Sequence, residues 1–344
     1  GTLDVYQKKT TDLLISRTLP GSAGFASTYY NQGAMKNNGV ELSLNAQIID
    51  KKDWKWSVSG NIGFNKSEIA ELGLLPSDFG FLGEKVGYYG NSIGDHFGVG
   101  HVFLEGEAPG LFFGYVTQGI VQPEDITEQG VKYTKKDGTI GYYQTFNKVA
   151  PVAGDIKFVD SDGDGDVNVN DRDVIGDPNP DFTYGFSTNI SWKNLSLSAS
   201  FAGVQGKDIL NTNNRYVNTP GTRSNNLTRK AYQNMWTESN HSNLYPSSTF
   251  VIQNYVMDRY VEDASYLRCA DITLNYILPK TWMSKIGFQN ASVYASVKNA
   301  FIITNYSGYD PDVNFFGFDG LRPGVDMGAY PTPRSFIFGL NLTF

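Results

Sequence analysis

Apolar and polar residues alternate with a period of two through several segments of the chain. In residues 37–49 and 54–65, valine, leucine, isoleucine and tryptophan line one face, while serine, asparagine, glutamine and charged residues line the other. Such alternation predicts β-strands with one apolar and one polar face. Residues 182–201 and 270–297 repeat the pattern, and each of these segments contains a turn. The sequence therefore predicts an all-β fold built from antiparallel hairpins.

The last ten residues of the chain, 335–344, form another alternating segment. Its apolar face consists of Phe336, Phe338, Leu340, Leu342 and Phe344. A strand with one apolar and one polar face that ends on phenylalanine resembles the assembly signal of outer-membrane barrels. We therefore assign that role to these five residues.

A transmembrane antiparallel β-barrel and a soluble β-sandwich both have strands with this period. No apolar run in the sequence approaches the roughly 18 to 20 residues of a membrane-spanning helix, but a barrel strand needs only about 9 to 11 alternating residues. The turns near 50–53, 193–194 and 279–288 are short, and the connections at the opposite ends of the strands are long. Because outer-membrane barrels have short periplasmic turns and long external loops, the connection lengths favour the barrel.

A strand count back from Phe344, with that residue at the periplasmic end, assigns the long connections to the outside of the cell. Extracellular loops are expected near 17–36, 66–95, 122–181, 206–263 and 304–334. The segment 66–181 must then begin and end outside, so it is either one large loop or a loop that contains a further hairpin of the barrel. Residues 95–104 and 111–121 are the candidates for that hairpin, and with them the chain has about ten strands.

Charge and composition argue against several classes of function. The chain has 35 acidic and 28 basic residues, with a net charge of -7 and no cluster of lysine and arginine, so we expect no nucleic-acid partner. Cys269 is the single cysteine, which excludes an intrachain disulfide, and we expect it to face the lumen of the barrel. His96, His101 and His241 lack the spacing of a catalytic or metal-binding set, so we expect no enzyme.

Several short stretches stand out along the chain: Asn37-Asn38-Gly39-Val40-Glu41, the segment 113–120 (FGYVTQGI), the run GDIK at 154–157 followed by DSDGDG at 160–165 and VIGDPNP at 174–180, and the blocks at 236–240, 308–312 and 328–331. In this collinear order they resemble sequence blocks of the SusC/RagA-like TonB-dependent transporters of Bacteroidota. The run from 154 to 180 is the most distinctive of them.

This resemblance implies a 22-stranded barrel in the bacterial outer membrane, with an N-terminal plug, coupling to TonB and a SusD-like surface lipoprotein that captures the ligand as a lid. The chain begins within a predicted strand, without a start methionine or signal peptide, and contains neither a plug domain nor a TonB box. We therefore expect the C-terminal portion of the barrel, with the coupling residues and part of the ligand site upstream.

The segment 160–171 has the spacing of an EF-hand-type cation-binding loop. Its candidate ligands are Asp160, Asp162, Asp164, Asp166, Asn168 and Asp171. Asp166 would offer its backbone carbonyl. The number of oxygen ligands favours calcium over magnesium, and aspartate rather than glutamate at the last position indicates a structural site rather than a sensor. The alternative is a solvated acidic loop, because Asp and Gly are also favoured in turns.

Sugar recognition combines aromatic platforms with carboxylate, amide and guanidinium groups. The predicted external loops supply candidates of both kinds: Trp236, Tyr245, Tyr309, Phe315, Phe316, Arg322, Asp326 and Tyr330. With the family resemblance, they predict TonB-dependent active import of oligosaccharides. Oligopeptide import stays open because the same family transports both, and packing within the loops or against the lid is the alternative for each side chain. A calcium-stabilised soluble or surface-attached adhesion module is the rival from another class.

Overall fold

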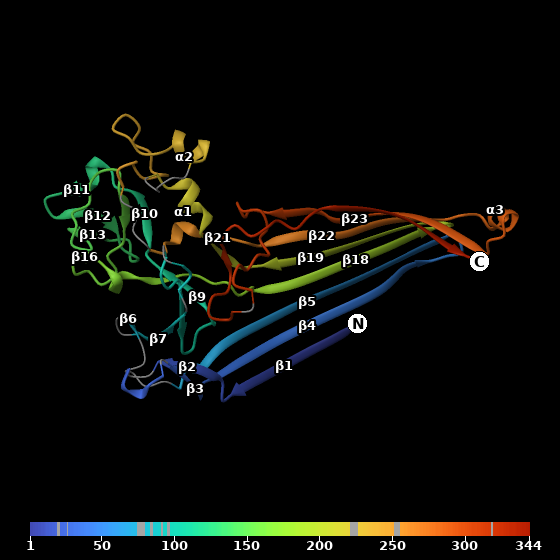
Figure 1. Cartoon of the computed structure of the whole chain (residues 1–344), viewed down its shortest axis with the longest axis horizontal. Coiled ribbons are helices and arrows are strands. Elements are labelled where there is room, and N and C mark those ends of the chain that lie inside the picture. The colour runs from blue at the N-terminus through green and yellow to red at the C-terminus, as the bar shows by residue number, and fades with distance from the viewer. Residues whose placement is uncertain are drawn as a thin grey trace.

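The computed structural model describes residues 1–18, 21–25, 27–73, 80–82, 85–90, 92–94, 97–220, 226–250, 255–317 and 319–344. Among them, eight long strands form one antiparallel sheet (Figure 1). The strands are β1 (Thr2–Thr11), β4 (Ala34–Asp50), β5 (Trp54–Glu71), β18 (Phe182–Trp192), β19 (Leu195–Gln205), β22 (Tyr266–Ile277), β23 (Asn290–Thr304) and β25 (Ser335–Thr343). Their order in the sheet is their order in the chain, so the sheet is an up-and-down meander.

The register sorts side chains into an apolar and a polar face. One transverse row consists of Ala46, Val58, Thr188, Ala199, Ile272, Val297 and Phe336. The neighbouring row consists of Asn45, Ser59, Ser187, Ser200, Asp271 and Lys298. Hydrogen bonds run along the polar row, with the hydroxyl oxygens of Ser59 and Ser187 2.6 Å apart. Large side chains of the apolar face are exposed, Phe338 by 79%, which suits contact with lipid.

The two ends of the long strands differ in their connections. β4 and β5, and β18 and β19, are joined by turns of two or three residues, and the short helix α3 (Lys280–Met283) lies between β22 and β23. At the opposite end the connections are residues 12–33, 72–181, 206–265 and 305–334. Figure 1 shows the C-terminus at the end with the short turns. The assignment of the other end to the outside of the cell stays a prediction.

Aromatic side chains mark the end of the sheet with the short turns. The rings of Trp54 and Trp192, which are paired in register, lie 6.0 Å apart. Phe344 lies 5.0 Å from Phe288. Aromatic residues at strand ends are typical of the interfacial girdles of barrels.

The predicted hairpin of 95–104 and 111–121 is wrong as part of the barrel wall. β5 pairs directly with β18, so residues 72–181 form one insertion and the sheet has eight long strands within the described residues, instead of about ten. β8 (His101–Leu104) and β9 (Leu111–Gly114) belong to a separate sheet of five short strands. Both are buried along their whole length, so they lack the polar face that a barrel strand presents to the lumen.

The insertion and the other long connections contain further short strands. They are β2 (Leu14–Thr18), β3 (Ser27–Asn31), β6 (Gly80–Leu82), β7 (Lys85–Tyr89), β10 (Thr117–Ile120), β11 (Ile126–Thr127), β12 (Gly130–Thr134), β13 (Ile140–Tyr143), β14 (Thr145–Phe146), β15 (Ile156–Phe158), β16 (Asp166–Val167), β17 (Asp173–Gly176), β20 (Asp208–Asn211), β21 (Val261–Asp263) and β24 (Val325–Asp326). Their largest buried cluster is aromatic, with the rings of Phe146 and Phe158 stacked at 4.4 Å and Tyr115 against both. This cluster also contains residues of the 206–265 and 305–334 connections, such as Leu210, Tyr260 and Val325, so it packs the insertion against these two connections.

Helices are short and few among the described residues. Besides α3, they are α1 (Asn213–Asn218) and α2 (Arg229–Gln233), with 3-10 turns such as the one at Val169–Asp171. No helix in this part of the chain is long and apolar enough to cross a membrane.

The prediction that Cys269 faces the lumen is wrong. Cys269 is paired in register with Phe201 on one side and Phe301 on the other, both of which belong to the apolar face. The register shifts at this point, between Cys269 and Asp271, so the alternation that holds from Asp271 onwards does not carry through the irregularity. The thiol is fully buried between its neighbours.

Candidate functional site

A groove of about 820 Å³ lies where two of the long connections, 206–265 and 305–334, meet. The strand β20, which follows closely after β19, organises it by pairing with β21 on one side and β24 on the other. These pairings bring α1, Glu262 and Asp326 to one place. Its volume is in the range of pockets that bind small molecules.

Asparagine side chains dominate one part of the groove: Asn211, Asn213, Asn214 and Asn218. Glu262 fixes this part because its carboxylate accepts hydrogen bonds from the amide groups of Asn211, at 2.9 Å, and Asn214. The same carboxylate accepts from the hydroxyl of Ser307 at 2.8 Å and from its backbone N–H at 2.9 Å. The amides are therefore held in place before any ligand enters.

Three of the predicted substrate-binding residues line this groove, namely Tyr245, Tyr309 and Asp326. Tyr309 is 79% exposed and Tyr245 is half-buried, so both rings offer apolar surface. Asp326 is buried, and its carboxylate accepts hydrogen bonds from the Tyr306 hydroxyl at 2.6 Å and the Gly328 backbone at 2.8 Å. Asp326 thus shapes the groove more than it offers free oxygens to a ligand.

Three other candidates form a separate packed unit. The Arg322 guanidinium lies 3.9 Å from the centre of the Phe316 ring, and Phe315 packs edge-on against Phe316 at 5.2 Å. Arg322 also donates to the carboxylate of Asp319 at 2.8 Å and to the backbone carbonyl of Ser92 at 3.1 Å. The bond to Ser92 joins the 305–334 connection to the insertion. Phe315, Phe316 and Arg322 therefore fit the alternative of packing within the loops.

The two remaining candidates differ in exposure. Trp236 is 9% exposed, stacks on His241 at 5.7 Å and donates its ring N–H to Gln122 at 3.1 Å, so it is a core residue. Tyr330 is 89% exposed and does not line the groove.

The two histidines within the described residues, His101 and His241, have different partners. His101 is fully buried, and its Nε2 lies 2.8 Å from the backbone carbonyl oxygen of Pro323. Burial lowers the pKa of His101 to about 4, so the ring is neutral at pH 7 and its Nε2–H donates to that carbonyl. His241 stacks on Trp236, and His96 lies outside the described residues.

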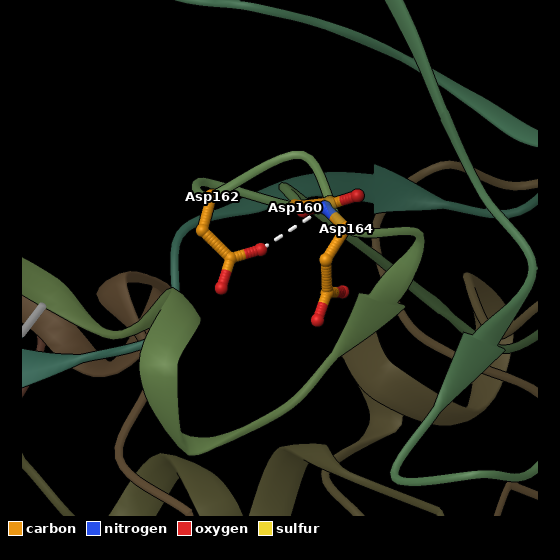
Figure 2. A group of neighbouring side chains, drawn as sticks. All are labelled: Asp160, Asp162 and Asp164. Carbon is orange, nitrogen blue, oxygen red and sulfur yellow. Dashed lines mark hydrogen bonds between the residues drawn. The ribbon is translucent and has the colours of Figure 1, made fainter.

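The acidic loop brings Asp160, Asp162 and Asp164 together, with one carboxylate oxygen of each within 4.8 Å of the others. Figure 2 shows the carboxylates of Asp162 and Asp164 projecting from the same side of the turn. Backbone bonds shape the turn: the Asp160 carboxylate accepts from Gly163 at 2.6 Å and from Gly165 at 2.9 Å. This arrangement offers hard oxygen ligands of the kind that calcium prefers.

The other predicted ligands have partners within the loop. The side chain of Asp166 forms an ion pair with Lys148 at 2.8 Å, and this bond lowers the pKa of Asp166 to about 2, which leaves the backbone as its possible ligand. Asp171 is buried, which raises its pKa to about 6, and its carboxylate accepts from Ser161 at 2.6 Å and Asn168 at 2.7 Å. In the described conformation, the side-chain carboxylate of Asp171 therefore closes the loop by accepting from backbone N–H groups of the loop.

Comparison with known proteins gives a consistent set of relatives. Residues 1–109 match the family model described as TonB dependent receptor-like, beta-barrel. The chain is 32% identical over 345 residues to TonB-dependent receptor P3 of Formosa agariphila, and 30% identical over 355 residues to TonB-dependent receptor SusC of Bacteroides thetaiotaomicron. These alignments cover 99% and 100% of this chain but only 32% and 30% of the relatives.

The chain thus spans about a third of the length of the curated relatives it matches. Among solved structures, the RagAB peptide importer in its open-open state matches with a TM-score of 0.72 and 28% identity, over 99% of this chain and 32% of that chain. The predicted antiparallel barrel is confirmed by these matches, and the soluble sandwich is not what the structure contains.

Proposed function

Because this chain is part of the outer-membrane β-barrel of a SusC/RagA-like TonB-dependent receptor, we propose that the whole protein imports oligosaccharides across the bacterial outer membrane. Import is active and draws its energy through TonB, which would act on parts of the protein outside this chain. A SusD-like surface lipoprotein captures the ligand and closes over the long connections, which lie outside the cell. The apolar face of the sheet contacts the lipids.

The observation that carries this proposal is the groove beside β20. Its exposed Tyr309 ring suits stacking on the apolar face of a sugar ring, and the fixed amides suit hydrogen bonding to hydroxyl groups. Of the predicted substrate-binding residues, Tyr245, Tyr309 and Asp326 stay in the proposed site. Trp236, Phe316 and Arg322 leave it because each is engaged in packing.

Oligopeptide import is the second candidate, because one of the solved structures that match this chain is a peptide importer, at 28% identity. Amide side chains bind a peptide backbone as readily as they bind sugar hydroxyls. Uptake assays with labelled oligosaccharides and labelled oligopeptides, in cells with and without the gene, separate the two. Uptake of peptides alone would replace the oligosaccharide proposal, and uptake of neither would reject both.

The role of the groove is tested with Tyr309→Ala in the full-length protein. Loss of a stacked ring costs about 1 kcal/mol or more, so we expect about fivefold weaker binding of the imported ligand. Tyr330→Ala is the matched control, since that ring is 89% exposed and lies outside the groove. Equal effects of the two substitutions on affinity would remove the groove from the proposed site.

We also propose that the acidic loop at 160–171 binds calcium as a structural ion, with magnesium as the weaker choice. Asp160, Asp162 and Asp164 would supply carboxylates, Asp166 its backbone carbonyl, and Asn168 and Asp171 the remaining oxygens after a local adjustment. An ion there offsets the repulsion of neighbouring carboxylates and orders the insertion.

Joint replacement Asp162→Ala and Asp164→Ala is expected to empty this site and to make the insertion sensitive to protease, while the barrel still assembles. Glu124→Ala with Glu128→Ala removes the same charge from exposed positions of the insertion and serves as the control. Identical proteolysis of the unmodified protein in calcium and in chelator, together with no anomalous diffraction signal at millimolar calcium, would leave only the solvated acidic loop.

A further inference from the structure

The groove beside β20 contains four charged side chains, of which two are acidic and two basic. They are Glu262, Asp326, Lys230 and Arg259. The formal charges of these four groups sum to zero, but the acidic and the basic groups differ in how many hydrogen-bond partners they have within the protein. Which of these charges is already satisfied decides what kind of ligand the groove favours.

Both carboxylates are engaged by the fold. Glu262 accepts from two asparagine amides and from both the hydroxyl and the backbone of Ser307. Asp326 accepts from the Tyr306 hydroxyl and from the backbone N–H groups of Gly328 and Ala329. Since these bonds use up much of the accepting capacity of the two groups, neither carboxylate is available to pair with a cation of the ligand.

The two cations are not engaged in this way. Arg259 donates through Nη2 to the backbone carbonyl of Leu244, but its Nη1 is buried and has no hydrogen-bond partner among the described residues. The nearby Asp258 forms no ion pair with Arg259 in the described part of the chain. Its carboxylate accepts from the hydroxyl of Thr117 at 2.6 Å and from the backbone N–H of Thr117 at 3.0 Å, and its charge only partly offsets the effect of burial on the pKa of Arg259. Burial lowers the pKa of Arg259, which indicates a charge that water solvates poorly.

Lys230 adds a second positive charge to the same groove. It is exposed on α2, and in the part of the chain that the structure describes its ammonium group forms no ion pair. An anion in the groove would therefore meet one exposed and one partly buried cation, and the two carboxylates of the groove already accept hydrogen bonds from the protein. An unpaired buried charged donor is costly, and an incoming anion removes that cost.

We propose that the groove selects ligands that carry a carboxylate, held by Arg259 and Lys230, on a framework rich in hydroxyl or amide groups. This inference rests on the proposed import function and narrows its ligand class. The carboxylate can belong to a uronic acid of an oligosaccharide or to the C-terminus of a peptide. Both sources present the same planar anion to a guanidinium.

Calorimetry on the full-length protein in detergent tests this with two matched pairs of ligands. A trisaccharide of hexuronic acids is compared with the neutral hexose trisaccharide of the same linkage, and a tripeptide with its C-terminal amide. We expect the acidic member of one pair to bind about tenfold tighter or more than its neutral partner. Whichever pair shows the preference identifies the source of the carboxylate.

Substitutions then assign the preference to the groove. Arg259→Gln and Lys230→Gln should each reduce the ratio of the affinity for the acidic ligand to that for the neutral one, while Arg259→Lys retains part of the preference. Arg229→Gln is the control, because it removes the same charge from the same helix as Lys230 but outside the groove. Equal loss of preference in Arg229→Gln and Lys230→Gln would overturn the assignment.

The outcomes also separate this inference from the proposed function. If neutral oligosaccharides or amidated peptides bind as tightly as their acidic partners, the carboxylate inference fails while import stands. If no ligand of either class binds or enters cells, the proposed function fails as well.

Discussion

Replacement of Gly339 by alanine should weaken the sheet at its last strand. Gly339 in β25 lies opposite Tyr294 in β23, and the tyrosine ring covers the glycine. A Cβ atom at Gly339 would lie 2.2 Å from Cε1 and Cζ of Tyr294 and 2.4 Å from its hydroxyl oxygen. Contacts this short force the ring or the strand to move.

The expected magnitude follows from two opposing effects. Overpacking of this kind typically costs about 1–3 kcal/mol. Alanine instead of glycine within a strand otherwise gains about 0.5–1 kcal/mol, because the unfolded chain loses freedom. Gly60→Ala in β5 isolates the second effect, since a Cβ there has as its nearest neighbour the carbonyl oxygen of Gly185 at 3.5 Å.

The two variants should therefore differ by about 1–3 kcal/mol in the free energy of unfolding, with Gly339→Ala the less stable. Urea unfolding of the folded barrel in detergent, followed by heat-modifiable mobility on gels, measures this difference. Tyr294→Ala should abolish it, so that Gly339→Ala becomes harmless in that background. Equal midpoints for Gly339→Ala and Gly60→Ala would refute the reasoning.

Three further predictions concern orientation, assembly and pH. With Cys269 first replaced by alanine, Gly320→Cys should react with an impermeant thiol reagent on intact cells and Lys193→Cys should not; the reverse result would invert the proposed orientation. Deletion of Phe344, whose ring is 79% exposed on the apolar face, should lower the amount of folded protein in the membrane, and an unchanged amount would argue against an assembly signal. The pKa of His101 falls from 6.5 to about 4 on folding, so the unfolded state binds more protons than the folded state between these two pH values. The contribution of the neutral His101 ring to the stability of the insertion is therefore fully present above about pH 6.5. As the pH falls toward 4, up to about 3 kcal/mol of this contribution is lost. Proteolysis of the insertion at pH 5 relative to pH 7.5 should therefore increase less in His101→Gln than in the unmodified protein, and an equal increase would assign the sensitivity elsewhere.

The strands of the barrel wall could be predicted because the alternation that specifies each of them lies within one short segment of the sequence. Each strand faces lipid on one side and a polar interior on the other, so alternation within a dozen residues determines both the strand and its faces. The hairpin of β18 and β19 was predicted from this pattern alone, including its turn at Lys193 and Asn194. The pattern fails where the register shifts, which is why the face of Cys269 was predicted wrongly.

The insertion could not be predicted in the same way because its strands are short, and two of them, β8 and β9, are buried on both faces. Residues 111–113, Leu-Phe-Phe, form a continuous apolar run rather than an alternating one, which was the available sign that β9 does not belong to the wall. Its partners β8 and β17 are set by tertiary packing, and β17 comes 59 residues after the end of β9 in sequence order, at Asp173 against Gly114. Local pattern carries no information about such pairings.

The residues of the groove could likewise be predicted only in part from the local sequence. Tyr245, Tyr309 and Asp326 were predicted by residue type, but Glu262 and Arg259 were missed because nothing in their immediate sequence points to a ligand. The dense run of asparagines from 211 to 218 was the signal that could have led to the site. Only the pairing of β20 with β21 and β24 reveals that these segments share one groove.

The barrel wall is specified by contacts within the sheet and the groove by pairings between connections, so substitutions should affect the two independently. The register of β25 with β23 depends on contacts such as Gly339 with Tyr294, which lie within the sheet. The groove depends on β20, whose partners β21 and β24 come from two separate connections. Substitutions at Arg259 should thus alter ligand preference with assembly intact, whereas Gly339→Ala should reduce assembly and leave the affinity of the protein that does fold unchanged. Since only the connections need to differ for the ligand to differ, one wall pattern can serve several ligand classes.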